Sequence, residues 1–98
     1  MSRPAKSKQR SYVYVLGSNG KGGFKTYVGW TNDVERRLAT HNAGKGARTT
    51  RGRMWRLLYS ESFKTRREAM SREWHLKRDR ALRKRLSDKA QLKSNSEA

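Results

Sequence analysis

The chain has 98 residues and a formal net charge of +17, from 25 Lys and Arg against 8 Asp and Glu. This length suits one compact domain, and the absence of Cys excludes disulfides and thiolate metal sites. The positive charge predicts a polyanionic partner, with nucleic acid as the first candidate. No apolar stretch approaches membrane-spanning length, so we expect no membrane partner and a reducing, cytoplasmic location.

The first segment, residues 1–10, is basic and lacks an apolar run, which predicts a flexible arm. Ser11–Leu16 is β-branched and aromatic and predicts a buried strand. The glycine-rich stretch Gly17–Gly23 predicts a hairpin connection, and Phe24–Trp30 predicts the returning strand. Gly29 is unusual inside a strand, where a glycine often marks a bulge or the close approach of a ligand.

A helix is predicted next, with Asn32 as its N-cap and Glu35 completing a capping box. Val34 and Leu38 supply its apolar stripe, and the helix is expected to end near 42–44. A Gly- and Arg-rich loop follows at Ala43–Arg53, and a third strand is predicted at Met54–Glu61. Two helices are predicted at Arg66–Lys77 and Arg80–Leu86, with a frayed tail at 87–98.

The predicted order β-β-α-β-α-α indicates an α+β fold, with a small three-stranded antiparallel sheet flanked by helices. The folded domain is expected to span residues 11–86. A second capping box, formed by Thr65 and Glu68, opens the helix that follows the third strand.

Arg37 and His41 are four residues apart on the first helix and are predicted to lie along one edge. The planar guanidinium of Arg37 fits phosphate oxygens. The more common fate of such an arginine is a surface salt bridge, here with Asp33, four residues earlier. A capping or half-buried role is likewise more common for His41 than catalysis.

Glu73 is predicted to lie in the middle of an apolar helix face, with Ala69, Met70 and Leu76. A carboxylate in that position requires a cation or metal nearby. In the alternative, the buried stripe consists of Met70, Trp74 and the Lys77 stem, and Glu73 lies at its edge beside an arginine. The pattern favours neither arrangement.

Three tyrosines lie on the predicted hairpin. Tyr12 and Tyr14 share one strand face, and Tyr27 lies on the paired strand. Ordinary strand packing explains all three, but it does not explain why a strand glycine follows Tyr27 by two residues.

Together these segments resemble the GIY-YIG endonuclease domain, and in particular its short stand-alone members. The resemblance covers Ser11–Leu86, with Tyr12 in place of the first triplet's glycine. The matching segments are, in chain order, Tyr12-Val13-Tyr14, Tyr27-Val28-Gly29, Asn32–Leu38, His41–Gly46, Thr49–Gly52 and Arg72-Glu73.

The resemblance implies roles for residues at matching positions. Tyr14 and Tyr27 correspond to the tyrosines of the two triplets, and Arg37 corresponds to the catalytic arginine. His41 stands where several members keep a further active-site residue, and Glu73 matches the carboxylate that binds one divalent metal. The chain is therefore expected to be a metal-dependent endonuclease that hydrolyses phosphodiester bonds in DNA, with branched or damaged structures as candidate substrates.

The residues also limit the chemistry. Eight scattered acids provide no carboxylate cluster for two metals, so one Mg²⁺ or Mn²⁺ ion at Glu73 is favoured. Arg37 is expected to hold a non-bridging phosphate oxygen. A hydrogen-bonded pair of Tyr14 and Tyr27, with His41 as a relay, is the hypothesis for the base. Surrounding cations are expected to lower the tyrosine pKa.

Phosphate contacts are expected from Arg48, Arg51, Arg53, Lys77 and Arg78, with DNA favoured over RNA. A dimer or a targeting partner is left open. The competing hypothesis is a non-catalytic nucleic-acid-binding protein that retains the nuclease fold. It leaves Glu73 unexplained, because a carboxylate repels phosphate.

Overall fold

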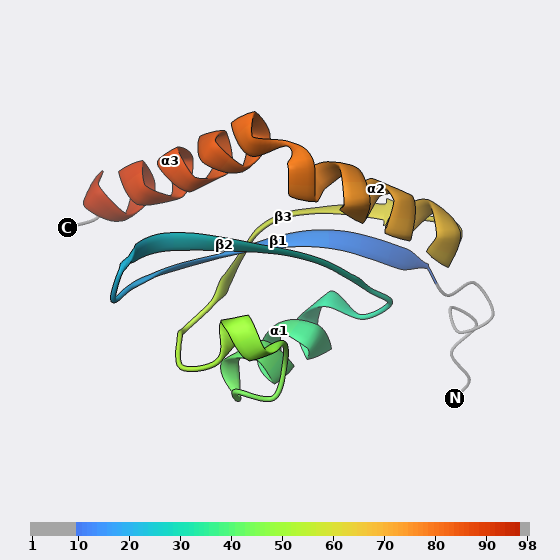
Figure 1. Cartoon of the computed structure of the whole chain (residues 1–98), viewed down its shortest axis with the longest axis horizontal. Coiled ribbons are helices and arrows are strands. Elements are labelled where there is room, and N and C mark those ends of the chain that lie inside the picture. The colour runs from blue at the N-terminus through green and yellow to red at the C-terminus, as the bar shows by residue number, and fades with distance from the viewer. Residues whose placement is uncertain (1–9, 97–98) are drawn as a thin grey trace.

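The computed structural model describes residues 10–96 (Figure 1). The predicted arm at 1–10 lies outside these residues, apart from Arg10. The order β-β-α-β-α-α and the α+β class are confirmed. The elements are β1 (Ser11–Gly20), β2 (Gly23–Thr31), α1 (Val34–Asn42), the 3₁₀ helix η2 (Arg48–Thr50), β3 (Arg56–Phe63), α2 (Arg66–Arg78) and α3 (Arg80–Ser96).

The three strands form one antiparallel sheet in the order β2-β1-β3, so β1 is central and β2 is an edge. The register of β1 and β2 sets Tyr14 opposite Gly29 and Leu16 opposite Tyr27. Opposite residues share a sheet face, so these four positions lie on one side. The sheet therefore brings both candidate tyrosines to the same face, as predicted.

Helices cover both faces of this sheet: α2 and α3 lie on one face, and α1 with η2 lies on the other (Figure 1). Alternation along β1 divides its side chains between two cores. The core on the α2 side contains Val13, Val15, Val28, Ala69 and Leu76. The core on the α1 side contains Tyr14, Leu16 and Trp55.

The β1–β2 hairpin is longer and tighter than predicted, because β1 continues to Gly20. Arg53 holds it closed: Nε donates to Ser18 Oγ at 3.2 Å, and Nη1 donates to Lys21 O at 3.0 Å. Its Nη2 donates to Ser18 O at 3.1 Å and to Gly23 O at 2.7 Å. The structure thus gives Arg53 a structural role, and its predicted phosphate contact stays a prediction.

The predicted N-cap of α1 is wrong by one residue. Asp33, in extended backbone conformation, caps the helix with its carboxylate, which accepts from Arg36 N at 3.1 Å. Thr31 Oγ1 accepts from Asp33 N at 3.2 Å and fixes the cap in place. The second capping box, of Thr65 and Glu68, is confirmed.

The third strand begins at Arg56, two residues later than predicted. The backbone of Trp55 is bound instead by the Asn42 amide: Trp55 N donates to Asn42 Oδ1 at 2.6 Å, and Asn42 Nδ2 donates to Trp55 O at 3.0 Å. This side-chain pairing links the end of α1 to the start of β3.

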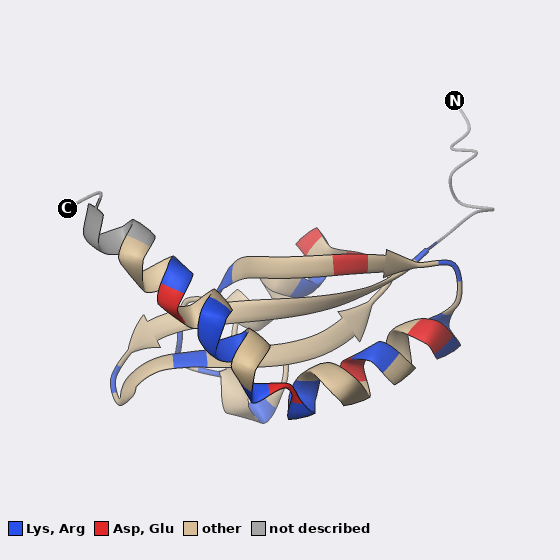
Figure 2. Ribbon diagram, turned by 90° about the horizontal axis from the view of Figure 1, so that it is seen from above, with Lys and Arg blue, Asp and Glu red and all other residues tan. Residues whose placement is uncertain are grey.

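The last helix was predicted to end at Leu86, but residues 87–96, predicted as a frayed tail, continue it. Leu82 and Leu86 pack on the core, and the segment beyond them is rich in helix-forming residues. Lys and Arg recur along both α2 and α3 (Figure 2). Within the described residues, no helix combines the length and apolar character needed to cross a bilayer.

Candidate active site

A chain of buried hydrogen bonds joins β1 to α1 and η2. Tyr14 Oη lies 3.0 Å from His41 Nε2, and His41 Nδ1 lies 2.9 Å from Thr50 Oγ1. Thr50 Oγ1 in turn donates to Ala47 O at 2.8 Å. Tyr14 is 1% exposed, and His41 and Thr50 are fully buried. The half-buried histidine considered in the sequence is therefore a fully buried one with both ring nitrogens bonded.

The directions of these bonds follow from the number of protons available. A carbonyl only accepts, so the single Thr50 hydroxyl proton goes to Ala47, and the threonine oxygen accepts from His41 Nδ1–H. With Nδ1 protonated, a neutral His41 presents the lone pair of Nε2 to Tyr14. The Tyr14 hydroxyl therefore donates to His41, which is oriented as a proton acceptor.

Burial shifts the pKa values of both partners. The pKa of Tyr14 is raised, chiefly by burial and further by Tyr27 and Glu73, although the hydrogen bond and charge of Arg37 act to lower it. The pKa of His41 is lowered by burial and by the Arg37 charge. The expected lowering of the tyrosine pKa is therefore wrong for Tyr14, because desolvation outweighs the nearby cation.

The Tyr14 hydroxyl contacts His41, not Tyr27 as predicted. The Tyr27 ring packs beside both groups, with its centroid 4.9 Å from that of His41 and 6.4 Å from that of Tyr14. Tyr27 is half-buried, so it forms a wall between the buried pair and solvent.

Two glycines leave room for this arrangement. A Cβ at Gly29 would lie 2.6 Å from Tyr14 Oη, and a Cβ at Gly46 would lie 2.3 Å from His41 Nδ1. Both distances are shorter than real Cβ contacts. The strand glycine noted in the sequence pairs regularly with Tyr14, without a bulge, and makes room for the Tyr14 hydroxyl.

Replacing Gly29 with Ala is expected to displace the Tyr14 hydroxyl from His41 and to cost about 1–3 kcal/mol of stability through overpacking. Urea unfolding and a nuclease assay measure the two effects. Gly20→Ala on β1 is the matched control, because its Cβ would meet only the flexible Arg53 side chain, at 3.4 Å. Equal behaviour of the two variants would show that the Gly29 contact is unimportant.

The burial of a neutral His41 predicts a loss of stability in acid. In the unfolded chain His41 binds a proton below pH about 6.5, whereas its lowered pKa makes the folded protein resist protonation. The unfolded state therefore binds more protons just below this pH, so the unfolding free energy decreases as the pH falls through it. Urea titrations at about pH 7.5 and about pH 5.5 measure this decrease.

The His41→Gln variant is expected to show a smaller change in unfolding free energy between these two pH values. His75→Gln is the control, because His75 is exposed on α2. A dependence that survives in His41→Gln and disappears in His75→Gln would assign the acid sensitivity to the wrong histidine.

Arg37 is half-buried on α1, and its side chain and positive charge act to lower the pKa of Tyr14. The alternative partner considered in the sequence, Asp33, uses its carboxylate to cap α1. The charge of Arg37 therefore acts on both members of the tyrosine–histidine pair, and its catalytic role stays a prediction.

Glu73 lies on α2, which covers the opposite face of the sheet from α1 (Figure 1). It lies between buried Ala69 and Leu76 on α2, and its charge raises the pKa of Tyr14. Its side chain is 20% exposed, and its carboxylate pairs with Lys77 Nζ at 3.3 Å. Met70 and Trp74 are exposed, so Glu73 occupies the inner edge of the helix, with a cation beside it as expected.

The other flank of α2 is anchored to β3. Arg72 Nε and Nη2 donate to both carboxylate oxygens of Glu61 at 3.0–3.2 Å, and the Tyr59 hydroxyl also bonds this carboxylate. The Arg72 hydrogen bond keeps the pKa of Glu61 low. Because Arg72 reaches toward β3, Glu73, about 100° further round the helix, faces the β2 edge.

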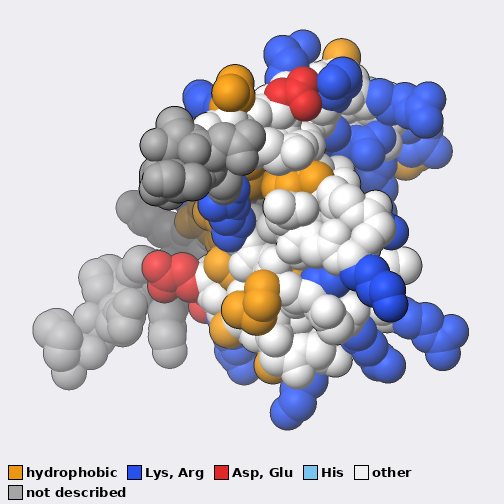
Figure 3. All heavy atoms as spheres, turned by 90° about the vertical axis from the view of Figure 1, so that its left-hand side faces the viewer, with side chains coloured by type: hydrophobic (Ala, Val, Ile, Leu, Met, Phe, Trp, Pro, Cys, Tyr) orange, Lys and Arg blue, Asp and Glu red, His pale blue; other side chains and the backbone are white. Residues whose placement is uncertain are grey.

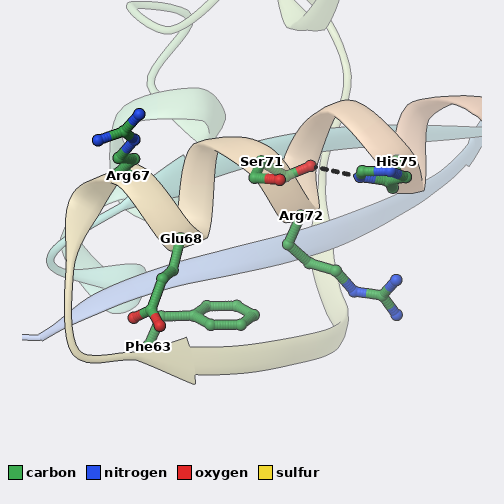
Figure 4. Close-up of a pocket in the computed structure, with 6 residues that line it drawn as sticks. All are labelled: Phe63, Arg67, Glu68, Ser71, Arg72 and His75. Atoms are coloured by element: carbon green, nitrogen blue, oxygen red, sulfur yellow. Dashed lines mark hydrogen bonds between the residues drawn. The ribbon is translucent and has the colours of Figure 1, made fainter.

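An open hollow of about 460 Å³ lies on this outer flank of α2 (Figure 4). It is lined by Phe63, Arg67, Glu68, Ser71, Arg72 and His75, whose Nδ1 donates to Ser71 O at 2.8 Å. The hollow contains none of the residues that surround Tyr14. The candidate site is instead centred on the buried Tyr14 hydroxyl of the central strand β1.

A divalent metal fits the chemistry of Glu73. Its carboxylate already holds the Lys77 ammonium in this structure. Within residues 10–96 no three His, Asp or Glu side chains gather around one point. A single hard oxygen ligand with several retained waters suits Mg²⁺ or Mn²⁺, and Glu73 is the residue that would hold the ion.

The predicted phosphate-binding residues are dispersed. Arg48 and Arg51 are exposed around η2, whereas the Arg78 guanidinium lies 3.7 Å from the centroid of the Trp74 ring. At the hairpin end of the molecule, Lys and Arg side chains outnumber acidic ones on the surface (Figure 3).

Three residues of the site were not singled out for these roles in the sequence: Thr50, Gly46 and Asn42. Thr50 orients His41, and Gly46 makes room for its ring. The surrounding sequence of Gly, Thr and Arg indicates only a turn. The roles of Thr50 and Gly46 depend on contacts with His41 that exist only when η2 is packed against α1.

Comparisons with known proteins give a consistent result. The family model described as the GIY-YIG catalytic domain matches residues 10–86. A UPF0213 protein of Streptococcus agalactiae serotype V is 52% identical over 68 residues, covering 67% of this chain and 73% of that protein. One of Clostridium perfringens is 45% identical over 69 residues, covering 69% and 71%. The solution structure of a UPF0213 protein of Bacillus halodurans is 40% identical, covers 79% of this chain and 81% of that one, and has a TM-score of 0.44.

Proposed function

Because the chain belongs to the GIY-YIG catalytic domain family, a family of nucleases, we propose that it is an endonuclease that hydrolyses phosphodiester bonds in DNA with one divalent metal ion. Family membership confirms the resemblance predicted from the motifs. The observation that supports the finer proposal is the surroundings of Tyr14: one phenol hydroxyl bonded to His41 and acted on by both Arg37 and Glu73.

Tyr14 is the proposed proton acceptor for the attacking water. The ordinary pKa values of a phenol and an imidazole make proton transfer from Tyr14 to His41 unfavourable by about 5 kcal/mol. The raised pKa of Tyr14 and the lowered pKa of His41 make this transfer still less favourable. The free protein therefore keeps the proton on Tyr14. Activation requires added positive charge near the hydroxyl, and His41 Nε2 then receives the proton.

Arg37 and Glu73 link this activation to the substrate. In the free protein Arg37 acts to lower the pKa of Tyr14, and an incoming phosphate would draw its guanidinium to a non-bridging oxygen. A divalent ion on Glu73 would replace the negative charge near Tyr14 with a net positive one and would stabilise the leaving 3′ oxygen. Substrate and metal together would then expose the phenol and favour its ionised form.

Phosphate binding is proposed to extend to the start of α3. A hollow of about 220 Å³ between α3 and β2 is lined by Phe24, Thr26, Arg80, Arg83, Lys84 and Ser87. Among the described residues, the buried Nε of Arg83 has no hydrogen-bond partner. A phosphate oxygen is a suitable acceptor for it. Thr26, which lines this hollow, and Gly29, which lies opposite Tyr14, are on the same edge strand. Their three-residue separation corresponds to about 10 Å along the strand.

The test is cleavage of labelled single-stranded, duplex and branched DNA by the purified chain. We expect products with Mg²⁺ or Mn²⁺ and none with excess chelator. Restoration of cleavage when the metal is returned would separate metal removal from damage to the protein.

The competing function, a nucleic-acid binder that never cuts, predicts tight binding and no products under any metal condition. It does not account for the Glu73 carboxylate, which faces the proposed phosphate site.

A further inference from the structure

Two large apolar side chains lie exposed beside the candidate site. Met70 is 47% exposed and Trp74 is 54% exposed, although burying either would be favourable. They are four residues apart on α2 and so lie on one helix face. Adjacent exposed apolar side chains of this size commonly mark a binding surface.

This pair, the Met70–Trp74 platform, lies on the same side of α2 as Glu73. Arg72 points toward β3 on one flank of the helix, where it bonds Glu61. At 3.6 residues per turn, the side chains that come after Glu73 around the helix, in the direction of solvent, are those of Lys77, Met70 and Trp74, in that order. The platform therefore forms the outer rim of the Glu73 side of the site.

The Trp74 indole is held rigidly for an exposed side chain. The Arg78 guanidinium stacks on it, 3.7 Å from the ring centroid, and Arg78 Nη1 donates to Trp74 O at 3.1 Å. The His75 ring meets its edge at a centroid distance of 5.1 Å. Arg78 lies over the indole, and Lys77 is one turn from Glu73, so apolar surface is bordered by positive charge.

We propose that the Met70–Trp74 platform stacks an unpaired nucleobase adjacent to the scissile phosphate, and so directs the site to single-stranded or branched DNA. The inference rests on the proposed function for the identity of the neighbouring phosphate. Arg78 covers one face of the Trp74 indole, so the base would stack on the other face, with its negative flanking phosphates near the guanidinium. In duplex DNA the base faces are already stacked, so the platform gains this contact only where bases are unpaired.

The experiment measures binding rather than cleavage. Anisotropy of a fluorescent oligo-dT strand and of a labelled blunt duplex is measured at fixed salt with chelator, for the wild type, Trp74→Ala and Trp74→Phe. Leu92→Ala on α3 is the matched control, because Leu92 is also an exposed apolar side chain, 70% exposed.

Trp74→Ala is expected to weaken single-strand binding about tenfold, the usual effect of losing one base–aromatic stack. Duplex binding should stay unchanged, and Trp74→Phe should retain most of the single-strand affinity. Single-stranded DNA should also quench the protein's tryptophan fluorescence in the wild type and much less in Trp74→Phe.

Equal weakening for strand and duplex, no weakening, or the same effect from Leu92→Ala would overturn the proposal. A doubled molecular mass in solution that Trp74→Ala abolishes would assign the platform to a second copy of the chain and would also overturn it. A protein that shows the strand-selective effect but never cuts DNA would uphold the platform and refute the proposed nuclease activity.

Discussion

Replacing Glu73 with Gln is expected to reduce cleavage at least about 100-fold, with nucleic-acid binding retained. The substitution keeps the size of the side chain and removes the negative charge that would hold the metal ion. Its side chain is only partly buried, and the Lys77 ion pair that it loses is a surface pair, so the effect on stability is expected to be small. Single-turnover cleavage at saturating Mg²⁺, with binding measured in parallel, separates the two effects.

Asp88→Asn provides the matched control. Asp88 pairs with Lys84 at 3.1 Å over the same i, i+4 spacing as Glu73 and Lys77, but on α3. It should cut at the wild-type rate. A Glu73→Gln protein that cuts normally would contradict the metal-binding role and leave Glu73 as a surface ion-pair residue.

Replacing Tyr14 with Phe is expected to lower the cleavage rate about 10²- to 10⁴-fold, the usual contribution of a general base. The variant keeps the buried ring and removes the hydroxyl that donates to His41. His41 Nε2 is then left as a buried acceptor without its partner, which costs about 1–3 kcal/mol. Urea unfolding identifies conditions in which the variant is fully folded, and rates are compared there.

Tyr12→Phe is the control for Tyr14→Phe, because Tyr12 lies two residues away on the same strand face and is half-buried. Its rate should match that of the wild type. If Tyr14→Phe cuts at the wild-type rate while Tyr27→Phe does not, the base is Tyr27.

The fold was largely predictable because its signals are local. The β-branched strands, the glycine-rich hairpin and the Thr65–Glu68 capping box depend on neighbouring residues, and each is present, although β1 runs further into the hairpin than predicted. The boundaries failed where distant or weak interactions decide them. The Asn42 amide takes the backbone of Trp55 out of β3, and favourable helix propensity extends α3 past Leu86.

The site was predictable in its members but not in its bonding. The motif spacing identified Tyr14, Arg37, His41 and Glu73; the structure bonds Tyr14 to His41, and the charges of Arg37 and Glu73 act on the pKa of Tyr14. The partner of the Tyr14 hydroxyl and the direction of its pKa shift were wrong. Both depend on how deeply the sheet face is buried, which side-chain spacing does not report.

The site straddles an edge strand, taking Arg37 and His41 from the layer on one face of the sheet and Glu73 from the layer on the other (Figure 1). Loss of either helical layer therefore dismantles it. The charge of +17, in contrast, belongs to the chain whether folded or not. A partly unfolded molecule is therefore expected to keep its electrostatic attraction to a polyanion while losing the arrangement of Arg37, His41 and Glu73.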